Sequence, residues 1–138
     1  MRQRARIYLS VATGGGLGSL ARWGFSLLAL QAFGGGFPWG TLGVNVVGSF
    51  LIGLYFTVTE PDGRYLVAPA ARQFVLAGFC GGFTTFSAFS LETLSMLRQQ
   101  AWAMAILYTG SSVILWLVGV WLGHAVGLRM NRLPGRRR

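Results

Sequence analysis

The sequence predicts an all-α integral membrane protein, organised as a single four-helix transmembrane domain over residues 1–138. Composition is the first indication, because 53% of the residues are hydrophobic and only 11% are charged, whereas soluble domains carry about 25% charged residues. The second is a set of four apolar segments, each near the roughly 20 residues that a helix needs to cross a bilayer. The expected spans are approximately 7–33, 39–58, 73–97 and 102–128. We therefore expect a multi-pass protein of the cell inner (plasma) membrane.

The four segments differ in how clearly they predict a membrane helix. The second and the fourth are uninterrupted apolar runs. The first contains Arg22, about two-thirds of the way along the segment. This arginine either reaches back to the nearer membrane interface or places a fixed positive charge at the mouth of a pore. The third segment is interrupted by glycines and hydroxyl residues.

The most informative stretch lies in this third segment, where residues 78–90 read GFCGGFTTFSAFS. Lipid cannot hydrogen-bond a freed backbone, so non-helical chain at membrane depth is tolerated only inside protein or beside a wet cavity. We expect a helix broken in mid-membrane, whose second half opens with Thr84 and Thr85 and then presents Phe86 and Phe89 on one face. Such an arrangement indicates an ion site. The alternative is a kinked helix in which glycine only allows close packing.

The net charge of +9 comes from twelve arginines and no lysine. Arginines that flank apolar segments hold membrane helices at an anionic lipid surface, so we expect contact with membrane lipid and none with nucleic acid. Ten arginines lie near the two ends of the chain or in the connection with Arg64 and Arg72, all on one side of a four-span protein, and Arg98 lies on the other side. The positive-inside rule then places both termini in the cytoplasm.

Small residues recur within the spans at the four-residue spacing that lets membrane helices touch. They are Gly14 and Gly18, Ser49 and Gly53, Gly78 and Gly82, and the series Gly119, Gly123 and Gly127. Ordinary helix packing explains them in the main. Because 138 residues make a thin bundle, we also expect these faces to form the seam of an oligomer.

Polar residues inside the spans form stripes on different helices. Thr41 and Asn45 lie one turn apart in the second span, as do Tyr108 and Ser112 in the fourth. Intramembrane polar groups are costly and usually face the bundle interior or a cavity. Together with the two phenylalanines of the third span they indicate a lined path, although Asn45 taken singly is equally well explained as a hydrogen-bonding link between helices.

The expected path favours a small, hard anion. Its donors are an amide and several hydroxyls, the edge of an aromatic ring is weakly positive, and we expect no acid among them. Arg22 adds a positive charge that focuses anions at one mouth.

Two motifs then match a known family. They are GTLxxNxxG over residues 40–48 and GGFTTFSAF over 81–89, supported by GxxxGxxxR over 14–22 and YxxxS over 108–112. With these motifs the chain resembles the Fluc (CrcB) family of fluoride channels of microorganisms, over nearly its whole length. The resemblance implies a channel that exports fluoride passively, built as an antiparallel (dual-topology) homodimer with two separate pores at the subunit interface.

The resemblance also implies roles for individual residues. Phe86 and Phe89 are expected to turn their ring edges toward fluoride, with the rings of one subunit completing the pore of the other. The remaining expected pore residues are Asn45, Thr41, Tyr108 and Ser112, with Arg22 in the vestibule. The backbone carbonyls of Gly81 and Thr84 are expected to hold a structural sodium ion at the centre of the dimer, since carbonyls freed by an unwound helix suit a cation.

The chain departs from the family pattern at two points. Trp116 stands one turn past Ser112, where the resemblance leads us to expect a second serine or another small residue. The strong arginine bias predicts one membrane orientation, whereas an antiparallel homodimer needs both. We expect the homodimer, and the alternative is pairing with a different, oppositely oriented partner.

A small four-helix proton-coupled multidrug exporter is the alternative function. Such a carrier needs an ionisable acid in mid-membrane, and Glu92 lies near the end of the third span, six residues before Arg98. An enzyme is not expected, because no spacing of nucleophile and base is visible around the single histidine, His124. We expect no site role for His124, and we expect Cys80 to be a small packing residue.

Overall fold

The computed structural model describes residues 2–132, and every regular element among them is a helix. The elements are α1 (Arg2–Phe33), α2 (Trp39–Val58), α3 (Pro69–Gln73), the π-helical segment η1 (Phe74–Cys80), α4 (Gly81–Phe83), α5 (Phe86–Arg98) and α6 (Trp102–Arg132). The predicted all-helical class is confirmed for this part of the chain.

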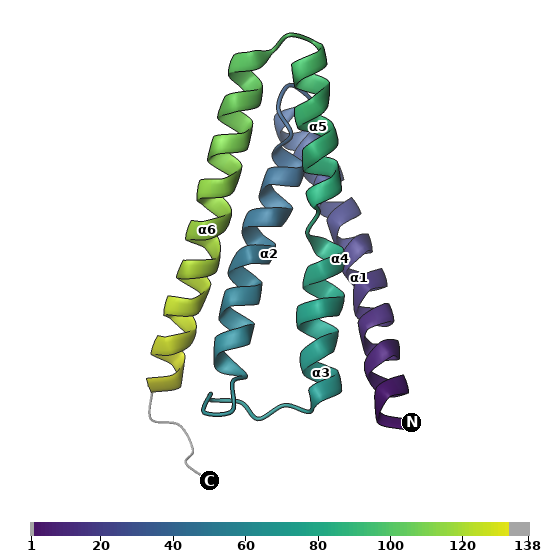
Figure 1. The fold of residues 1–138 in the computed structure, drawn as a ribbon, viewed down its shortest axis with the longest axis vertical. Coiled ribbons are helices and arrows are strands. Elements are labelled where there is room, and N and C mark those ends of the chain that lie inside the picture. Colours follow the sequence, from purple (N-terminus) through teal and green to yellow (C-terminus); the bar gives the residue numbers. More distant parts are fainter. Residues whose placement is uncertain (1, 133–138) are drawn as a thin grey trace.

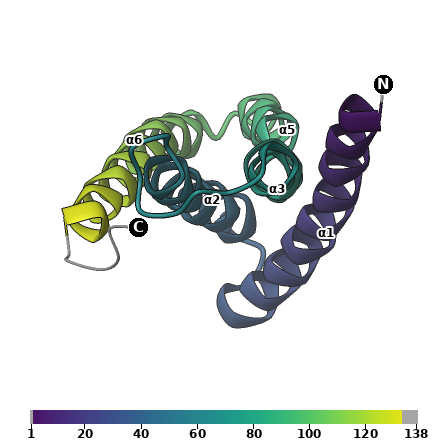
Figure 2. The same ribbon diagram turned by 90° about the horizontal axis from the view of Figure 1, so that it is seen from below.

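The helices form four rods, because α3, η1, α4 and α5 follow one another along a single interrupted rod (Figure 1). Seen from below, α2 lies between α6 and the interrupted rod, and α1 crosses the outer side of that rod (Figure 2). The start of α1, the end of α6 and the α2–α3 connection all lie at the lower end of the molecule in Figure 1. This arrangement brings most of the arginine-bearing segments to one end.

Three helical segments are long and apolar enough to cross a membrane, namely 39–58, 69–98 and 102–132. They contain the second, third and fourth predicted spans, and the protein is a multi-pass membrane protein. The first predicted span is helical throughout, within α1, but it is not among these three, and Arg4, Arg6 and Arg22 all lie in this helix. That α1 also crosses the membrane stays a prediction.

The predicted break in the third rod is confirmed. Helix α4 ends at Phe83, and Thr84 and Thr85 have extended backbone angles, φ −82° and ψ 162° for the first and φ −152° and ψ 126° for the second. Helix α5 then begins at Phe86, capped by the Thr85 hydroxyl, which accepts a hydrogen bond from the Ala88 N–H at 3.2 Å. Threonine is a favoured N-cap, so the chain restarts its helix directly after the break. The kinked but continuous alternative is excluded.

The rod begins and ends differently from the predicted span. Pro69 stands at the first helical position, where its fixed φ suits a helix start and its missing N–H costs nothing. Helix α3 therefore begins four residues before the expected position 73. At the other end of the chain, α6 continues past 128 with Arg129 and Arg132 in its last turn, where cations interact favourably with the helix dipole.

The spaced glycines of α1 pack directly against the spaced glycines and backbone of the third rod. A Cβ atom at Gly18 would collide with the Phe79 carbonyl oxygen, and one at Gly82 with the Gly15 carbonyl oxygen. Gly14 and Gly78 are equally close to the facing backbone. Two helix backbones therefore touch along this seam, and only hydrogen fits in place of a side chain.

A second seam of the same kind joins α2 to α6. A Cβ atom at Gly53 would collide with the Val120 carbonyl oxygen, and one at Gly123 with the Phe50 carbonyl oxygen. The prediction that these small residues serve helix packing is confirmed. The prediction that the same faces form an oligomer seam is wrong, because the chain buries them against its own helices.

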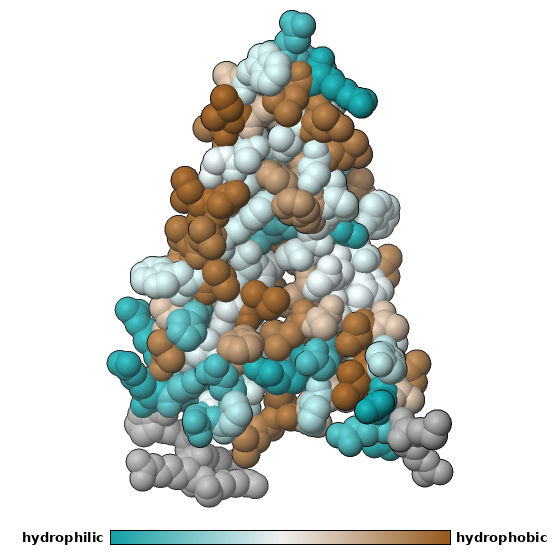
Figure 3. All heavy atoms as spheres, viewed as in Figure 1, coloured by the Kyte–Doolittle hydropathy of each residue, from teal (hydrophilic) through white to brown (hydrophobic). Residues whose placement is uncertain are grey.

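Polar side chains gather at both ends of the molecule, and apolar side chains cover the length between them (Figure 3). At the lower end, the Arg64 guanidinium donates to the Met130 carbonyl at 2.9 Å, and Asn131 Nδ2 donates to the Thr57 carbonyl at 3.1 Å. These bonds tie the α2–α3 connection and α2 to the end of α6. Arg136, Arg137 and Arg138, which entered the charge count, lie outside the described residues.

Candidate ion pathway

Asn45 of α2 holds the backbone of the break. Its Oδ1 accepts a hydrogen bond from the Thr85 N–H at 2.7 Å, and its Nδ2 donates to the Thr85 carbonyl at 2.8 Å. The side chain is 5% exposed. Both ends of the amide are therefore paired with the backbone N–H and carbonyl of one residue, as a neighbouring strand would pair with it. Of the two interpretations of Asn45, the structure favours the link between helices, although one N–H of its amide group is still available.

This clamp frees a carbonyl. In a continuous helix the Thr85 N–H would donate to the Gly81 carbonyl four residues earlier, but here it donates to Asn45. The Thr84 carbonyl, next in the break, accepts a hydrogen bond from Arg22 Nη1 at 3.3 Å. Arg22 thus reaches from α1 to the break, and the alternative in which it extends to the membrane interface is wrong.

The predicted cation site has the donor atoms that it needs. A carbonyl oxygen has two lone pairs, so Thr84 can accept from Arg22 and still face a cation. Gly81 lies on the surface of the single chain, and a Cβ added there would meet nothing within 4 Å. Its φ of −63° and ψ of −37° are ordinary helical values. Glycine is therefore not required there for its backbone angles, and the open surface is the feature consistent with a shared site.

The two predicted pore phenylalanines contact each other but lie in different surroundings. Phe86 is 71% exposed, whereas Phe89 is 7% exposed, and their ring centroids are 5.6 Å apart. Phe89 packs with Leu42 and Tyr108 in the apolar core between α2, α5 and α6. The pair therefore extends from the interior of the chain to its surface.

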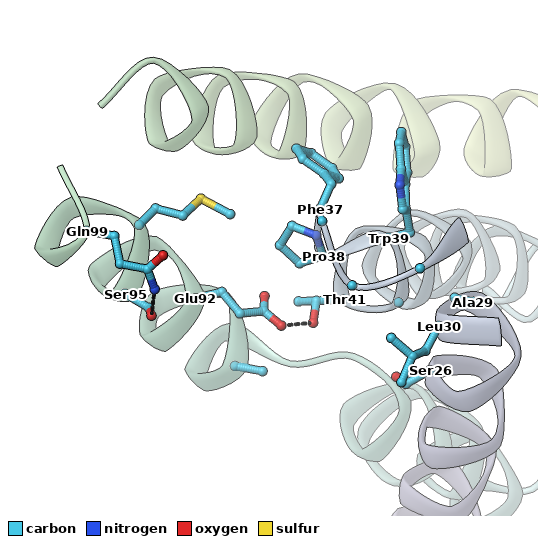
Figure 4. A pocket seen from close by; sticks show the side chains of 16 residues that line it. Ser26, Ala29, Leu30, Phe37, Pro38, Trp39, Thr41, Glu92, Ser95 and Gln99 are labelled. Carbon is cyan, nitrogen blue, oxygen red and sulfur yellow. Dashed lines mark hydrogen bonds between the residues drawn. The ribbon is translucent and has the colours of Figure 1, made fainter. Parts of the chain in front are cut away.

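Glu92 joins the predicted polar stripes of α2 and α6. The Thr41 hydroxyl donates to Glu92 Oε1 at 2.7 Å, and the Tyr108 hydroxyl donates to Oε2 at 2.6 Å. Figure 4 shows the carboxylate of α5 pointing across the cavity toward Thr41. The expectation that no acid lies among the polar groups of the path is wrong, because an acid accepts from two of its hydroxyls.

The sequence contained a signal for Glu92. This residue follows Phe89 by three positions, so the two share a face of α5. Its place near the end of the predicted span does not separate it from the polar stripes, because α5 continues to Arg98 and Glu92 lies more than one turn inside the helix.

Farther along α6, the polar stripe continues with Ser112 and then Trp116. Tyr108 and Ser112 are both 0% exposed. The Ser112 hydroxyl and the Trp116 indole nitrogen are buried, and neither has a hydrogen-bond partner within the described chain. The Trp116 ring meets Phe89 edge to face, with centroids 5.0 Å apart and planes at 74°.

Two cavities lie along this line of residues. A cavity of about 590 Å³ opens between the α1–α2 connection and α5, and its lining includes Thr41 and Glu92 (Figure 4). A second cavity, of about 260 Å³, lies at the break, lined by Asn45, Gly48, Ser49, Ile52, Thr84, Thr85, Phe86 and Trp116. Polar groups of α2, α5 and α6 thus run from an open vestibule toward the interrupted helix.

Two further residues behave as helix-packing groups. Cys80 is buried and free, beside the α1 seam, which confirms its predicted packing role. His124 Nδ1 lies 2.7 Å from the Thr57 hydroxyl across the α2–α6 seam. Among the described residues no group of three or more histidine, cysteine or acidic side chains could hold a metal ion, so a cation at the break would depend on carbonyls.

Comparison with known proteins gives matches over nearly the full length. A family model described as CrcB-like protein, Camphor Resistance (CrcB), matches residues 9–124. The fluoride-specific ion channel FluC of Opitutus terrae is 52% identical over 129 residues, which are 94% of this chain and 98% of that protein. Fluoride-specific ion channel FluC 1 of Rhodopseudomonas palustris is 48% identical over 135 residues, 98% of this chain and 96% of its own.

A third relative, fluoride-specific ion channel FluC 1 of Bradyrhizobium diazoefficiens, is 51% identical over 129 residues, 94% of this chain and 89% of that protein. The residues that the family model matches, 9–124, contain the break in the third rod and the polar stripes of α2 and α6. On this ground the chain belongs to the CrcB-like family.

Proposed function

We propose that this protein is a fluoride-selective ion channel that exports fluoride passively across the cell membrane. The observation that carries the proposal is the line of polar groups from α2, α5 and α6 that ends at a broken helix and its two phenylalanines. Relatives that match nearly the whole chain are named fluoride-specific ion channels. The protein is a channel and not an enzyme.

In this function Thr41, Tyr108 and Ser112 line the path of the anion. A hydroxyl has one proton to donate, so the Ser112 hydroxyl, which has no partner in the described chain, is the one that replaces part of the hydration shell of the anion. Glu92 orients Thr41 and Tyr108, because both donate to its carboxylate. Phe86 and Phe89 supply ring edges, which are weakly positive. Asn45 positions the break and offers its remaining N–H, and Arg22 adds a positive charge at the same depth.

The proposed assembly is an antiparallel homodimer with two pores. Its support is the incompleteness of the single chain at the break. Phe86 is 71% exposed, although it is a large apolar ring beside polar groups, and it lines the cavity at the break. A second copy in the opposite orientation would cover Phe86 and close the cavity.

The proposal includes a structural sodium ion held by the carbonyls of Gly81 and Thr84. Oxygen ligands suit a hard cation, and the Asn45 clamp takes away the helical partner of the Gly81 carbonyl. When bound, the ion would offset the partial negative charge of the freed carbonyls. Gly81 faces open space in the single chain, so two copies could bring their carbonyls to one ion.

One observation supports the alternative of a proton-coupled exporter, and another argues against it. Glu92 is an acid within the third membrane segment, which a proton-coupled carrier needs. It is, however, held between two hydroxyls, and relatives that match nearly the whole chain are named fluoride-specific ion channels. We therefore retain the channel.

Growth of bacteria that lack their own fluoride exporter tests the proposal in cells. Expression of this protein should restore growth in millimolar fluoride at neutral to mildly acidic pH, and the Phe86→Ile variant at equal membrane abundance should not. If both restore growth, the pore assignment fails. If neither does, the channel itself is refuted, provided that the protein reaches the membrane.

A further inference from the structure

Two polar atoms inside the bundle have no hydrogen-bond partner in the described chain, and both belong to α6. They are the Ser112 hydroxyl oxygen and the Trp116 indole nitrogen. Ser112 is 0% exposed. A buried polar group without a partner costs free energy and is rare in native proteins. Two such groups one helical turn apart therefore indicate a common ligand.

The surroundings of the two atoms connect them to the candidate pathway. The Trp116 ring stands edge to face against Phe89, with centroids 5.0 Å apart. Phe89 also contacts Tyr108, at a centroid separation of 5.2 Å. On its other side Trp116 lines the cavity at the break, together with Thr85 and Phe86. The indole thus lies between the buried hydroxyl stripe and the cavity.

The chemistry of the missing ligand follows from the donors. An indole N–H can donate a hydrogen bond and cannot accept one, and a serine hydroxyl can donate as well. A ligand shared by both is a hydrogen-bond acceptor. The neighbouring aromatic edges also favour negative charge. A small anion that accepts strong hydrogen bonds satisfies both donors, whereas a cation leaves the indole N–H without an acceptor.

We propose that the Trp116 indole N–H and the Ser112 hydroxyl together bind the permeating anion, which makes Trp116 a selectivity residue of the pore. The inference rests on the proposed function. It assigns a role to the residue at which this chain departs from the expected serine or other small residue, because the indole N–H supplies a donor that cannot act as an acceptor, whereas a serine hydroxyl can do either. The bulk of the ring also narrows the path, which favours a small anion over a larger one.

The test is fluoride efflux from liposomes that contain the full-length protein, with Trp116→Phe as the variant. Phenylalanine keeps an aromatic ring against Phe89 and removes the N–H. We expect fluoride efflux per protein to fall at least tenfold, with the fluoride concentration for half-maximal flux raised. The matched control is Trp121→Phe, on the same helix but 64% exposed, and its efflux should equal that of the unmodified protein.

A double variant separates a shared ligand from two independent roles. If both donors bind one anion, Ser112→Ala combined with Trp116→Phe should lower efflux little more than the stronger single change does, because interacting sites are not additive. Multiplied losses would contradict the shared site. Unchanged or increased efflux in Trp116→Phe would overturn the proposal, since water would then suffice for the N–H or the ring would only obstruct the path.

A more conservative replacement keeps the proposal testable if Trp116→Phe does not fold. Exchange of the indole for benzothiophene at this position removes only the N–H and keeps the shape of the side chain. A tenfold loss of efflux supports the donor role, and normal efflux overturns it. The unmodified protein separates failure of this anion site from failure of the proposed function. If the unmodified protein does not conduct fluoride, the proposed function itself is refuted.

Discussion

At the scale of single residues, the site depends on polar side chains whose hydrogen bonds are made to other groups of the protein. Asn45 uses both ends of its amide on the backbone N–H and carbonyl of Thr85, and Glu92 accepts from Thr41 and Tyr108. Such fixed groups cost little reorganisation when an ion arrives. The groups left for the ion are the Ser112 hydroxyl and the Trp116 indole N–H, the remaining N–H of the Asn45 amide, and the ring edges.

The exposed ring of Phe86 gives the first prediction. Phe86→Ile should lower fluoride efflux at least about tenfold, since losing an interaction of about 1.4 kcal/mol changes an equilibrium or rate tenfold. Isoleucine keeps apolar bulk and lacks the positive edge. Efflux from liposomes checks this, with Phe33→Ile as the control, because Phe33 is similarly exposed at 67% but lies at the end of α1. Equal efflux in the two variants would contradict the edge-on role.

Glu92 gives the second prediction. Glu92→Ala should lower the stability of the purified protein by about 1–3 kcal/mol for each hydroxyl left without its acceptor. Those hydroxyls belong to Thr41 and Tyr108, which are 7% and 0% exposed. The measurement is the thermal unfolding midpoint in detergent. Glu60→Ala, in the α2–α3 connection, serves as control and should change stability by less than about 0.5 kcal/mol. A midpoint for Glu92→Ala as high as that of the control would refute the carboxylate as the link between the two helices.

At the scale of elements, the broken rod depends on its neighbours on both sides. Helix α1 contributes glycines that let its backbone touch η1 and α4, and α2 contributes the amide that replaces the missing helical bonds. A π-helical segment immediately before the break fits this picture, because such segments concentrate at functional sites. The break is thus stabilised by contacts with residues that are distant in the sequence.

The α2–α6 seam gives the third prediction. Gly123→Ala should destabilise the chain by about 1–3 kcal/mol through overpacking, because its Cβ would collide with the Phe50 carbonyl oxygen and come within 2.8 Å of the Leu54 nitrogen. Gly110→Ala on the same helix is the control, since nothing lies within 4 Å of its Cβ. It should be neutral or slightly stabilising, as alanine favours a helix over glycine. Thermal midpoints of the two purified variants check this, and equal midpoints would contradict the close seam.

The sequence predicts the individual helices well, and it predicts less well which helices pack against each other. The second span over 39–58 and the break after Phe83 are correct, because apolar length and a TT pair after glycines have local causes. The sequence does not predict which helices pair through the small-residue faces, α1 with the third rod and α2 with α6, nor the link through Glu92. Both depend on which helix lies next to which, and a periodic pattern along one helix does not contain that information.

At the scale of the whole molecule, the charge bias and the incomplete site favour different arrangements. The arginine-rich segments gather at one end of the chain, which favours one orientation. The exposed Phe86 and the open cavity at the break favour a partner in the opposite orientation. Since the glycine seams are used inside the chain, the dimer interface is expected on the exposed face of α5 and around Gly81.

Orientation gives the fourth prediction. Single cysteines placed at either terminus of a Cys80→Ala protein should each be labelled to about half from outside the cell, with a thiol reagent that cannot cross the membrane. Cys80 is the one native cysteine, so its removal leaves no other target. Complete protection of both termini would mean one orientation, and the chain would then need a different, inverted partner. Disruption of the membrane in a parallel sample gives the value for full labelling.

The most direct test of the central claim is ion efflux from liposomes reconstituted with the purified protein, followed in parallel with fluoride and chloride electrodes. The account predicts rapid fluoride efflux and chloride efflux no faster than from protein-free liposomes, since hydroxyl and indole donors in a narrow path select a small, strongly accepting anion. Equal efflux of both ions would contradict selectivity at this site. The absence of fluoride efflux from well-folded protein would contradict the channel.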